Sequence, residues 1–133
     1  GNLGKNKLIK VRDIMRIGQN IPSINIQSSL KDAIKEITNK KVGFTGIINN
    51  KSKLVGILTD GDLRRALLNK KSIESSIEDC MTKNPITLDG SEMAIEAVNI
   101  MEKSKINCFL IIDNNDEVIG MLNLNDLFRS KVI

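Results

Sequence analysis

The sequence contains no histidine, tryptophan or tyrosine and only three phenylalanines among its 133 residues. Without imidazole, the chain cannot form a Ser-His-Asp or Cys-His nucleophilic site, and it lacks the commonest transition-metal ligand. The many carboxylates include no pair set apart by its spacing, as general acid-base catalysis would require. The composition therefore predicts no catalytic residues and no metal site in this chain, and it favours binding over catalysis.

Cysteine and long apolar runs are also scarce. The only cysteines, Cys80 and Cys108, form no Cys-x-x-Cys motif, so we interpret both as reduced core thiols of a cytoplasmic protein rather than zinc ligands. The longest apolar run, Cys108–Ile112, has five residues, whereas a membrane span needs about 20. No apolar leader is visible at the N-terminus. We therefore expect a soluble, cytoplasmic protein with no membrane contact.

The net charge of +4 comes from one end of the chain. Residues 1–20 hold five basic side chains and one acidic one, and the other 113 residues are electrically balanced. Nucleic-acid binding is disfavoured, because the sequence offers no broad basic face and almost no aromatic rings to stack on bases. We interpret residues 1–10 as a solvated linker.

The most informative feature is an internal repeat. Residues 28–65 match residues 92–129 at a constant offset of 64 without a gap. A shorter match joins residues 11–15 to residues 77–81 at an offset of 66. The identical pairs include Ala33/Ala97, Lys41/Lys105, Ile47/Ile111, Gly56/Gly120, Leu58/Leu122, Asp62/Asp126 and Arg65/Arg129. A two-copy repeat predicts one module with a pseudo-twofold axis, built from residues 11–70 and 71–133.

Both repeats predict the same order of elements. In the first repeat, a strand at 24–26 precedes a helix whose N-cap is Ser28 or Ser29. One face of this helix carries Leu30, Ala33, Ile34 and Ile37. Hairpin strands at 44–49 and 54–58 and a helix starting at Thr59 follow. In the second, the elements are a strand at 86–88, a helix at about 91–104, hairpin strands at 108–113 and 117–122 and a helix at about 124–130. A short helical turn ends at Met15 or Met81 before each repeat. The predicted fold class is α+β, with two β-α-β-β-α repeats.

Two stretches carry a family resemblance. Gly56–Arg65, which reads Gly-Ile-Leu-Thr-Asp-Gly-Asp-Leu-Arg-Arg, and Asp79–Pro85, which reads Asp-Cys-Met-Thr-Lys-Asn-Pro, resemble the CBS domain. CBS domains occur in tandem pairs called Bateman modules, and the resemblance covers about residues 11–130. More narrowly, Val11–Pro22 and Leu58–Leu67 resemble the C-terminal CBS pair of D-arabinose-5-phosphate isomerases, which feed Kdo synthesis for lipopolysaccharide or capsule.

This resemblance implies a regulatory role within an enzyme. In that family a sugar-isomerase (SIS) domain precedes the pair and interconverts D-arabinose 5-phosphate and D-ribulose 5-phosphate. We therefore expect a preceding SIS domain, no isomerase activity in this chain alone, and a homo-oligomer in which CBS-pair dimers form part of a tetrameric parent. No cofactor is expected to be required, and the expected regulatory ligand is AMP, ATP or the pathway nucleotide CMP-Kdo.

The closing motif has a structural and a functional interpretation. Thr59 and Asp62 have the spacing of a capping box, which would stabilise the helix start. In CBS domains that bind adenine nucleotides, the matching hydroxyl and carboxylate contact phosphate and ribose. The second copy has Asn123 in place of the threonine and keeps Asp126, so we expect two unequal sites. The resemblance implies a ligand set of Ile24, Gly43, Phe44, Thr59, Asp62, Arg64, Asn107, Asn123 and Asp126.

Several alternatives stay open from the sequence. Gly43 either lies close to a base or simply ends the preceding helix, and Arg64 and Arg65 either reach a phosphate or form a solvated helix face. The pair could also serve only to hold an oligomer together, with empty clefts. A third alternative is a CBS pair from another host, such as a transporter or a dehydrogenase.

Overall fold

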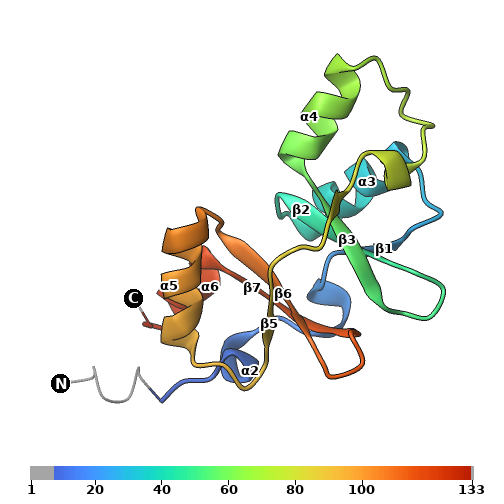
Figure 1. Ribbon diagram of the computed structural model, residues 1–133. Coiled ribbons are helices and arrows are strands. Elements are labelled where there is room, and N and C mark those ends of the chain that lie inside the picture. Colours follow the sequence, from blue (N-terminus) through green and yellow to red (C-terminus); the bar gives the residue numbers. More distant parts are fainter. Residues whose placement is uncertain (1–7, 133) are drawn as a thin grey trace. The chain divides into compact units, whose positions relative to one another are not determined.

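The computed structural model describes residues 8–132 and divides into two compact units (Figure 1). We call residues 21–85 the first-repeat unit. The second-repeat unit consists of residues 8–20 together with residues 86–132.

The first-repeat unit is a four-stranded sheet with two helices. Its elements are β1 (Ser23–Asn25), α3 (Leu30–Lys40), β2 (Phe44–Ile48), β3 (Leu54–Thr59), α4 (Asp60–Leu68), the 3-10 helix η2 (Ile77–Asp79) and β4 (Thr82–Lys83). The strand order is β1-β2-β3-β4, with β1 parallel to β2 and the other pairs antiparallel. Its apolar core comes from Leu30, Ala33, Ile47, Leu58, Ala66 and Ile77.

The second-repeat unit has a three-stranded sheet that repeats the order and directions of β1, β2 and β3. Its elements are α2 (Val11–Ile14), the 3-10 helix η1 (Gly18–Asn20), β5 (Thr87–Asp89), α5 (Ala94–Ser104), β6 (Cys108–Ile112), β7 (Val118–Asn123) and α6 (Leu124–Arg129). The sheet order is β5-β6-β7, parallel and then antiparallel. Ile47 lies opposite Gly56 and Ile111 opposite Gly120, and each hairpin has an irregularity directly after that pair. The predicted α+β class and the order of elements in both repeats are confirmed.

The compact units do not follow the sequence repeats at their N-terminal ends. Val11 is fully buried in the core of the second-repeat unit, and its N–H donates to the carbonyl of Glu92 at 2.8 Å. Ile77, its counterpart at an offset of 66, is fully buried in the first-repeat unit. The N-terminal segment of each sequence repeat therefore completes the core of the unit built mainly from the other repeat.

Two details of the α-helices differ from the sequence expectation. Helix α5 begins at Ala94 rather than at about residue 91, because the N–H of Ser91 bonds to the side chain of Asp89 in a turn and Ala94 N–H donates to the carbonyl of Ile9 at 2.8 Å. Ile34, predicted on the buried face of α3, is 36% exposed. Of the two N-cap candidates for α3, the structure uses Ser29.

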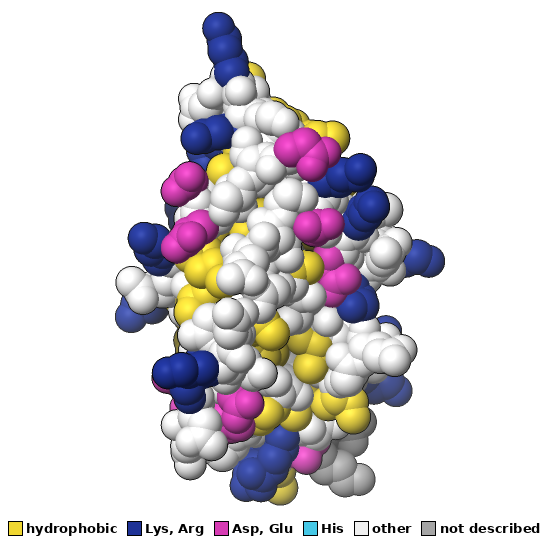
Figure 2. Space-filling model, turned by 90° about the vertical axis from the view of Figure 1, so that its right-hand side faces the viewer, with side chains coloured by type: hydrophobic (Ala, Val, Ile, Leu, Met, Phe, Trp, Pro, Cys, Tyr) yellow, Lys and Arg dark blue, Asp and Glu magenta, His cyan; other side chains and the backbone are white. Residues whose placement is uncertain are grey.

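Surface chemistry agrees with the balanced charge of most of the chain. On the face that Figure 2 presents, Lys and Arg side chains are interspersed with Asp and Glu rather than gathered in one patch. Among residues 8–132, no helix combines the length and apolarity that crossing a membrane would need.

Candidate ligand site

The start of α4 carries the two residues that the sequence singled out. Thr59 ends β3 in an extended conformation and is the N-cap of α4. Its Oγ1 accepts the N–H of Asp62 at 3.1 Å, and Asp62 Oδ2 accepts the N–H of Thr59 at 3.0 Å. The capping box is confirmed, so the motif holds the helix start whether or not a ligand binds.

Asp62 has further partners that the sequence did not reveal. Its Oδ1 accepts from Arg65 Nη2 at 2.7 Å, and Thr82 Oγ1 on β4 lies 3.1 Å from each carboxylate oxygen. The Asp62 side chain is 6% exposed, whereas that of Arg65 is 66% exposed and Thr82 is exposed as well. A ribose hydroxyl that bonded to Asp62 would therefore displace the side chain of Thr82 or Arg65. Water can solvate either of these side chains after it has left the carboxylate.

The other predicted residues of the first-repeat unit lie at separate points around this helix start. Gly43 precedes β2, and its carbonyl accepts the N–H of Asp60 at 3.0 Å. Phe44 is buried and lies opposite Thr59 in the sheet, while Ile24 packs against the core from β1. Arg64 is exposed on α4. The joint use of these residues by a ligand stays a prediction.

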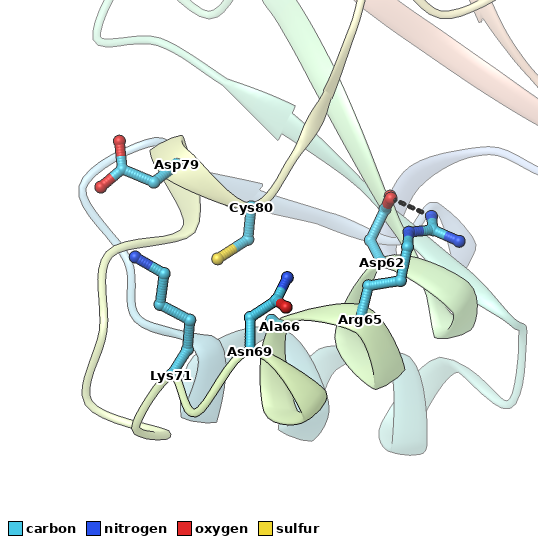
Figure 3. A pocket seen from close by; sticks show the side chains of 7 residues that line it. All are labelled: Asp62, Arg65, Ala66, Asn69, Lys71, Asp79 and Cys80. Atoms are coloured by element: carbon cyan, nitrogen blue, oxygen red, sulfur yellow. Dashed lines mark hydrogen bonds and ion pairs between the residues drawn. The ribbon is translucent and has the colours of Figure 1, made fainter.

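A pocket of about 200 Å³ opens beside α4 in the first-repeat unit (Figure 3). Asp62 and its partner Arg65 line one side, and Asn69 and Lys71 lie toward Asp79 and Cys80 of the η2 segment. Of the predicted ligand set, the pocket lining includes Asp62 alone. The remaining lining residue is Ala66.

The start of α6 repeats this arrangement with different side chains. Asn123 Oδ1 accepts the N–H of Asp126 at 2.9 Å, and Asp126 Oδ2 accepts the N–H of Asn123 at 3.0 Å. The carbonyl of Asn107, which is exposed, accepts the N–H of Leu124 at 2.9 Å, as Gly43 does in the first repeat. Asp126 is 1% exposed, and both Arg16 and Arg129 donate to its Oδ1.

Sequence reasoning therefore missed two residues that contact the carboxylates. Thr82 and Arg16 directly follow Met81 and Met15, where the match at an offset of 66 ends. The backbone at these points crosses close to the repeated glycines: a Cβ on Gly56 would lie 2.9 Å from the carbonyl oxygen of Thr82. The identity of Gly56 and Gly120 reflects this close approach.

The described residues also include two carboxylates with lowered pKa values and two thiols. Cys80 and Cys108 are free thiols, and burial raises the pKa of Cys108 to about 11. Hydrogen bonds from Ser29 and Ser91, respectively, lower the pKa values of Asp32 and Asp89. Within residues 8–132, no group of three or more His, Cys, Asp or Glu side chains is placed to hold a metal ion.

Fold and site together define a tandem CBS pair: the CBS domain family model matches residues 11–69 and 77–132, and the chain belongs to that family. Along its whole length it is similar to the arabinose 5-phosphate isomerases KdsD of Pseudomonas aeruginosa, with 39% identity, and Escherichia coli K12, with 37%. The chain spans 41% and 40% of the length of these relatives.

Solved CBS pairs have the same fold. The crystal structure of CBSX2 in complex with AMP is 25% identical, with a TM-score of 0.81 over 93% of this chain and 96% of that one. The CBS domain pair of protein MJ0100, in complex with 5′-methylthioadenosine and S-adenosyl-L-methionine, is 26% identical, with a TM-score of 0.81 over 92% and 94%.

Proposed function

We propose that this chain is a regulatory module that binds a nucleoside phosphate or nucleotide sugar through the start of α4. The observation that carries the proposal is the Thr59–Asp62 pair at the end of a strand in a CBS fold. Similar CBS pairs crystallised with AMP and with S-adenosyl-L-methionine support an adenosine-containing ligand.

The chemistry of the helix start suits such a ligand. The Asp62 carboxylate accepts the hydroxyl protons of a ribose in place of Thr82 and Arg65, and Thr59 retains its O–H to donate to a phosphate oxygen. Helix α4 has nine residues, so its N-terminal dipole favours an anionic group there. Arg64, exposed on the same helix, adds a cation for that phosphate.

We further propose that the module regulates an arabinose-5-phosphate isomerase. The similarity to KdsD along the whole chain supports this host. Interconversion of D-arabinose 5-phosphate and D-ribulose 5-phosphate then takes place in a preceding SIS domain, in a cytoplasmic homo-oligomer that supplies Kdo synthesis. CMP-Kdo is the candidate for feedback by the pathway, and AMP or ATP is the general alternative.

A calorimetric titration tests the binding function. We expect one of AMP, ATP or CMP-Kdo to bind the chain, and Asp62→Asn to weaken binding about ten- to a hundredfold, because a hydrogen bond to a charged acceptor contributes about 1.5–3 kcal/mol. Asparagine keeps an oxygen for the capping box, so the fold is retained. Glu74→Gln, which removes the same charge from an exposed loop, serves as the control and should leave the affinity unchanged.

The alternative function, a structural module that holds an oligomer together, also has an observation in its favour. In the second-repeat unit, α5 and α6 form an apolar hollow of about 360 Å³ lined by Val98, Met101, Glu102, Ile106, Leu124 and Phe128. Phe128 is 56% exposed at its edge, which suits burial against a second copy of the chain. The same titration separates the two functions, because the absence of binding by all three nucleotides would favour the structural role.

A further inference from the structure

The two repeats differ at one position beside their equivalent carboxylates. Thr82 reaches Asp62 with a hydroxyl, 3.1 Å from each oxygen. Arg16 reaches Asp126 with a guanidinium, whose Nε lies 3.1 Å from Oδ1. Residues 16 and 82 are related by the same offset of 66 that relates Met15 to Met81.

The backbone places these two residues in the same way. Thr82 lies opposite Ile57 in the sheet, and Arg16 lies opposite Met121, which is the residue that corresponds to Ile57. Arg16 is held by two hydrogen bonds with Met121, of 2.8 and 3.0 Å. The difference between the repeats therefore lies in the side chain and not in its position.

The two side chains differ in how readily a ligand can displace them. The Thr82 hydroxyl is neutral and exposed, so water can solvate it when a ribose hydroxyl takes its place on Asp62. Arg16 is permanently charged and only 27% exposed, and Asp126 is 1% exposed. Displacing Arg16 by a neutral ribose would leave a partly buried guanidinium without its counter-ion, which is unfavourable.

Local charge strengthens this contrast. At α4 the Asp62 carboxylate faces one guanidinium, that of Arg65, and the group is neutral. At α6 the Asp126 carboxylate faces two guanidiniums, from Arg16 and Arg129. Asp126 is therefore paired with two cationic side chains, whereas Asp62 is paired with one.

We infer that the residue at positions 16 and 82 decides which repeat accepts a ribose: Thr82 leaves Asp62 open to a nucleoside, and Arg16 closes Asp126. This inference rests on the proposed nucleotide-binding function. The ion pair of Asp126 with Arg16 then joins residues 8–20 to α6 of the second-repeat unit.

An exchange of the two residues tests this inference with AMP as the probe. Four proteins are titrated by calorimetry: the unmodified chain, Arg16→Thr, Thr82→Arg and the double exchange. We expect one AMP per unmodified chain, a second binding event in Arg16→Thr, and at least tenfold weaker binding in Thr82→Arg. In the double exchange, Asp126→Asn rather than Asp62→Asn should weaken binding.

Arg12→Thr is the matched control, because it removes the same charge from an exposed neighbouring position and should add no binding event.

If Arg16→Thr does not fold, the side-chain Nε–H resonance of Arg16 in the unmodified chain gives the same information. It should not move at saturating AMP while the amides of residues 59–62 shift, and movement of the Arg16 resonance would overturn the inference. Two AMP binding events of equal affinity in the unmodified chain would overturn the inference but not the proposed binding function. Unchanged AMP binding after the exchange of residues 16 and 82 would do the same. If none of the four proteins binds AMP, both the inference and the proposal of an adenosine-containing ligand are contradicted.

Discussion

The thiol of Cys108 shows how the surroundings of a single side chain change its pKa. Cys108 begins β6 and is partly buried, and that burial raises the pKa of its thiol to about 11 because a thiolate is poorly solvated there. The sequence predicted two reduced core thiols, whereas the structure shows two free thiols that are both half-buried. The shifted pKa depends on packing around residue 108 and so could not be predicted from composition.

This shift predicts slow thiol chemistry at Cys108. In a Cys80→Ser variant at pH 8, Cys108 should react with an aromatic disulfide reagent at least about a hundredfold more slowly than a small-molecule thiol, because little thiolate is present. The rate should rise about tenfold per pH unit toward pH 11. Absorbance at fixed reagent concentration measures it.

The Cys108→Ser variant, which leaves Cys80, controls for changes in the reagent with pH. A rate for Cys108 that levels off below about pH 10 would contradict the raised pKa.

The N–H groups at the starts of the helices are bonded either by nearby side chains or by residues far away along the chain. In α3, Ser29 Oγ accepts the N–H of Asp32 at 3.3 Å, and Asp32 Oδ2 accepts the N–H of Ser29 at 3.0 Å. In α5 the N-cap is Met93, which makes no side-chain cap, and the carbonyl of Ile9 bonds the N–H of Ala94 instead. The sequence revealed the first kind of cap and missed the second, because Ile9 is far away along the chain.

The α3 cap makes a testable contribution to stability. Ser29→Ala should lower the free energy of unfolding by about 1 kcal/mol, since it leaves an N–H of the first turn without its side-chain acceptor. Ser28→Ala is the matched control and should change it by less than about 0.5 kcal/mol. Urea unfolding followed by circular dichroism measures both, and equal effects would contradict Ser29 as the cap.

The same cap has a defined pH dependence. Hydrogen bonds from Ser29 lower the pKa of Asp32, so the folded state holds the carboxylate more strongly than the unfolded state does. Its stabilisation is therefore complete above the ordinary pKa near 4 and is lost as the pH falls through the lowered pKa. The difference between Ser29→Ala and the unmodified chain should accordingly shrink in acid.

At the scale of the whole molecule, the compact units and the sequence repeats do not coincide. Residues 8–20 belong to the unit formed by residues 86–132, through the buried Val11 and the backbone bonds of Arg16 with Met121.

A core substitution in this segment tests the division. Val11→Ala should lower the free energy of unfolding by about 2 kcal/mol, because it removes two buried methyl groups and leaves a cavity. Hydrogen exchange followed by mass spectrometry should show the lost protection in residues 86–132 rather than in residues 21–85.

Ile17→Ala is the matched control, since Ile17 lies in the same segment and is 62% exposed. Its effect should stay below about 0.5 kcal/mol. Greater loss of protection in residues 21–85 than in residues 86–132 for Val11→Ala would contradict the division.

Much of the architecture could be predicted because the spacing of apolar residues along the chain indicates helices and strands. The spacing of Leu30, Ala33 and Ile37 indicated a helix, the paired apolar runs indicated hairpins, and the constant offset carried these predictions from one repeat to the other. Ile34 shows where this reasoning fails. Its counterpart Val98 shares an apolar hollow with Leu124 and Phe128, whereas the corresponding residues of the first repeat are the polar Asp60 and Arg64.

The sequence alone determined the fold class, the repeat and the Thr59–Asp62 helix start, because periodicity and capping act over a few residues. Only the tertiary structure decided which side chains surround the two carboxylates, because Thr82 and Arg16 lie 20 and 110 positions away from Asp62 and Asp126. Contacts of that range depend on sheet register and on which unit a segment joins, and neither leaves a local pattern in the chain. That is why the two motifs look alike in sequence but present different surroundings to a ligand.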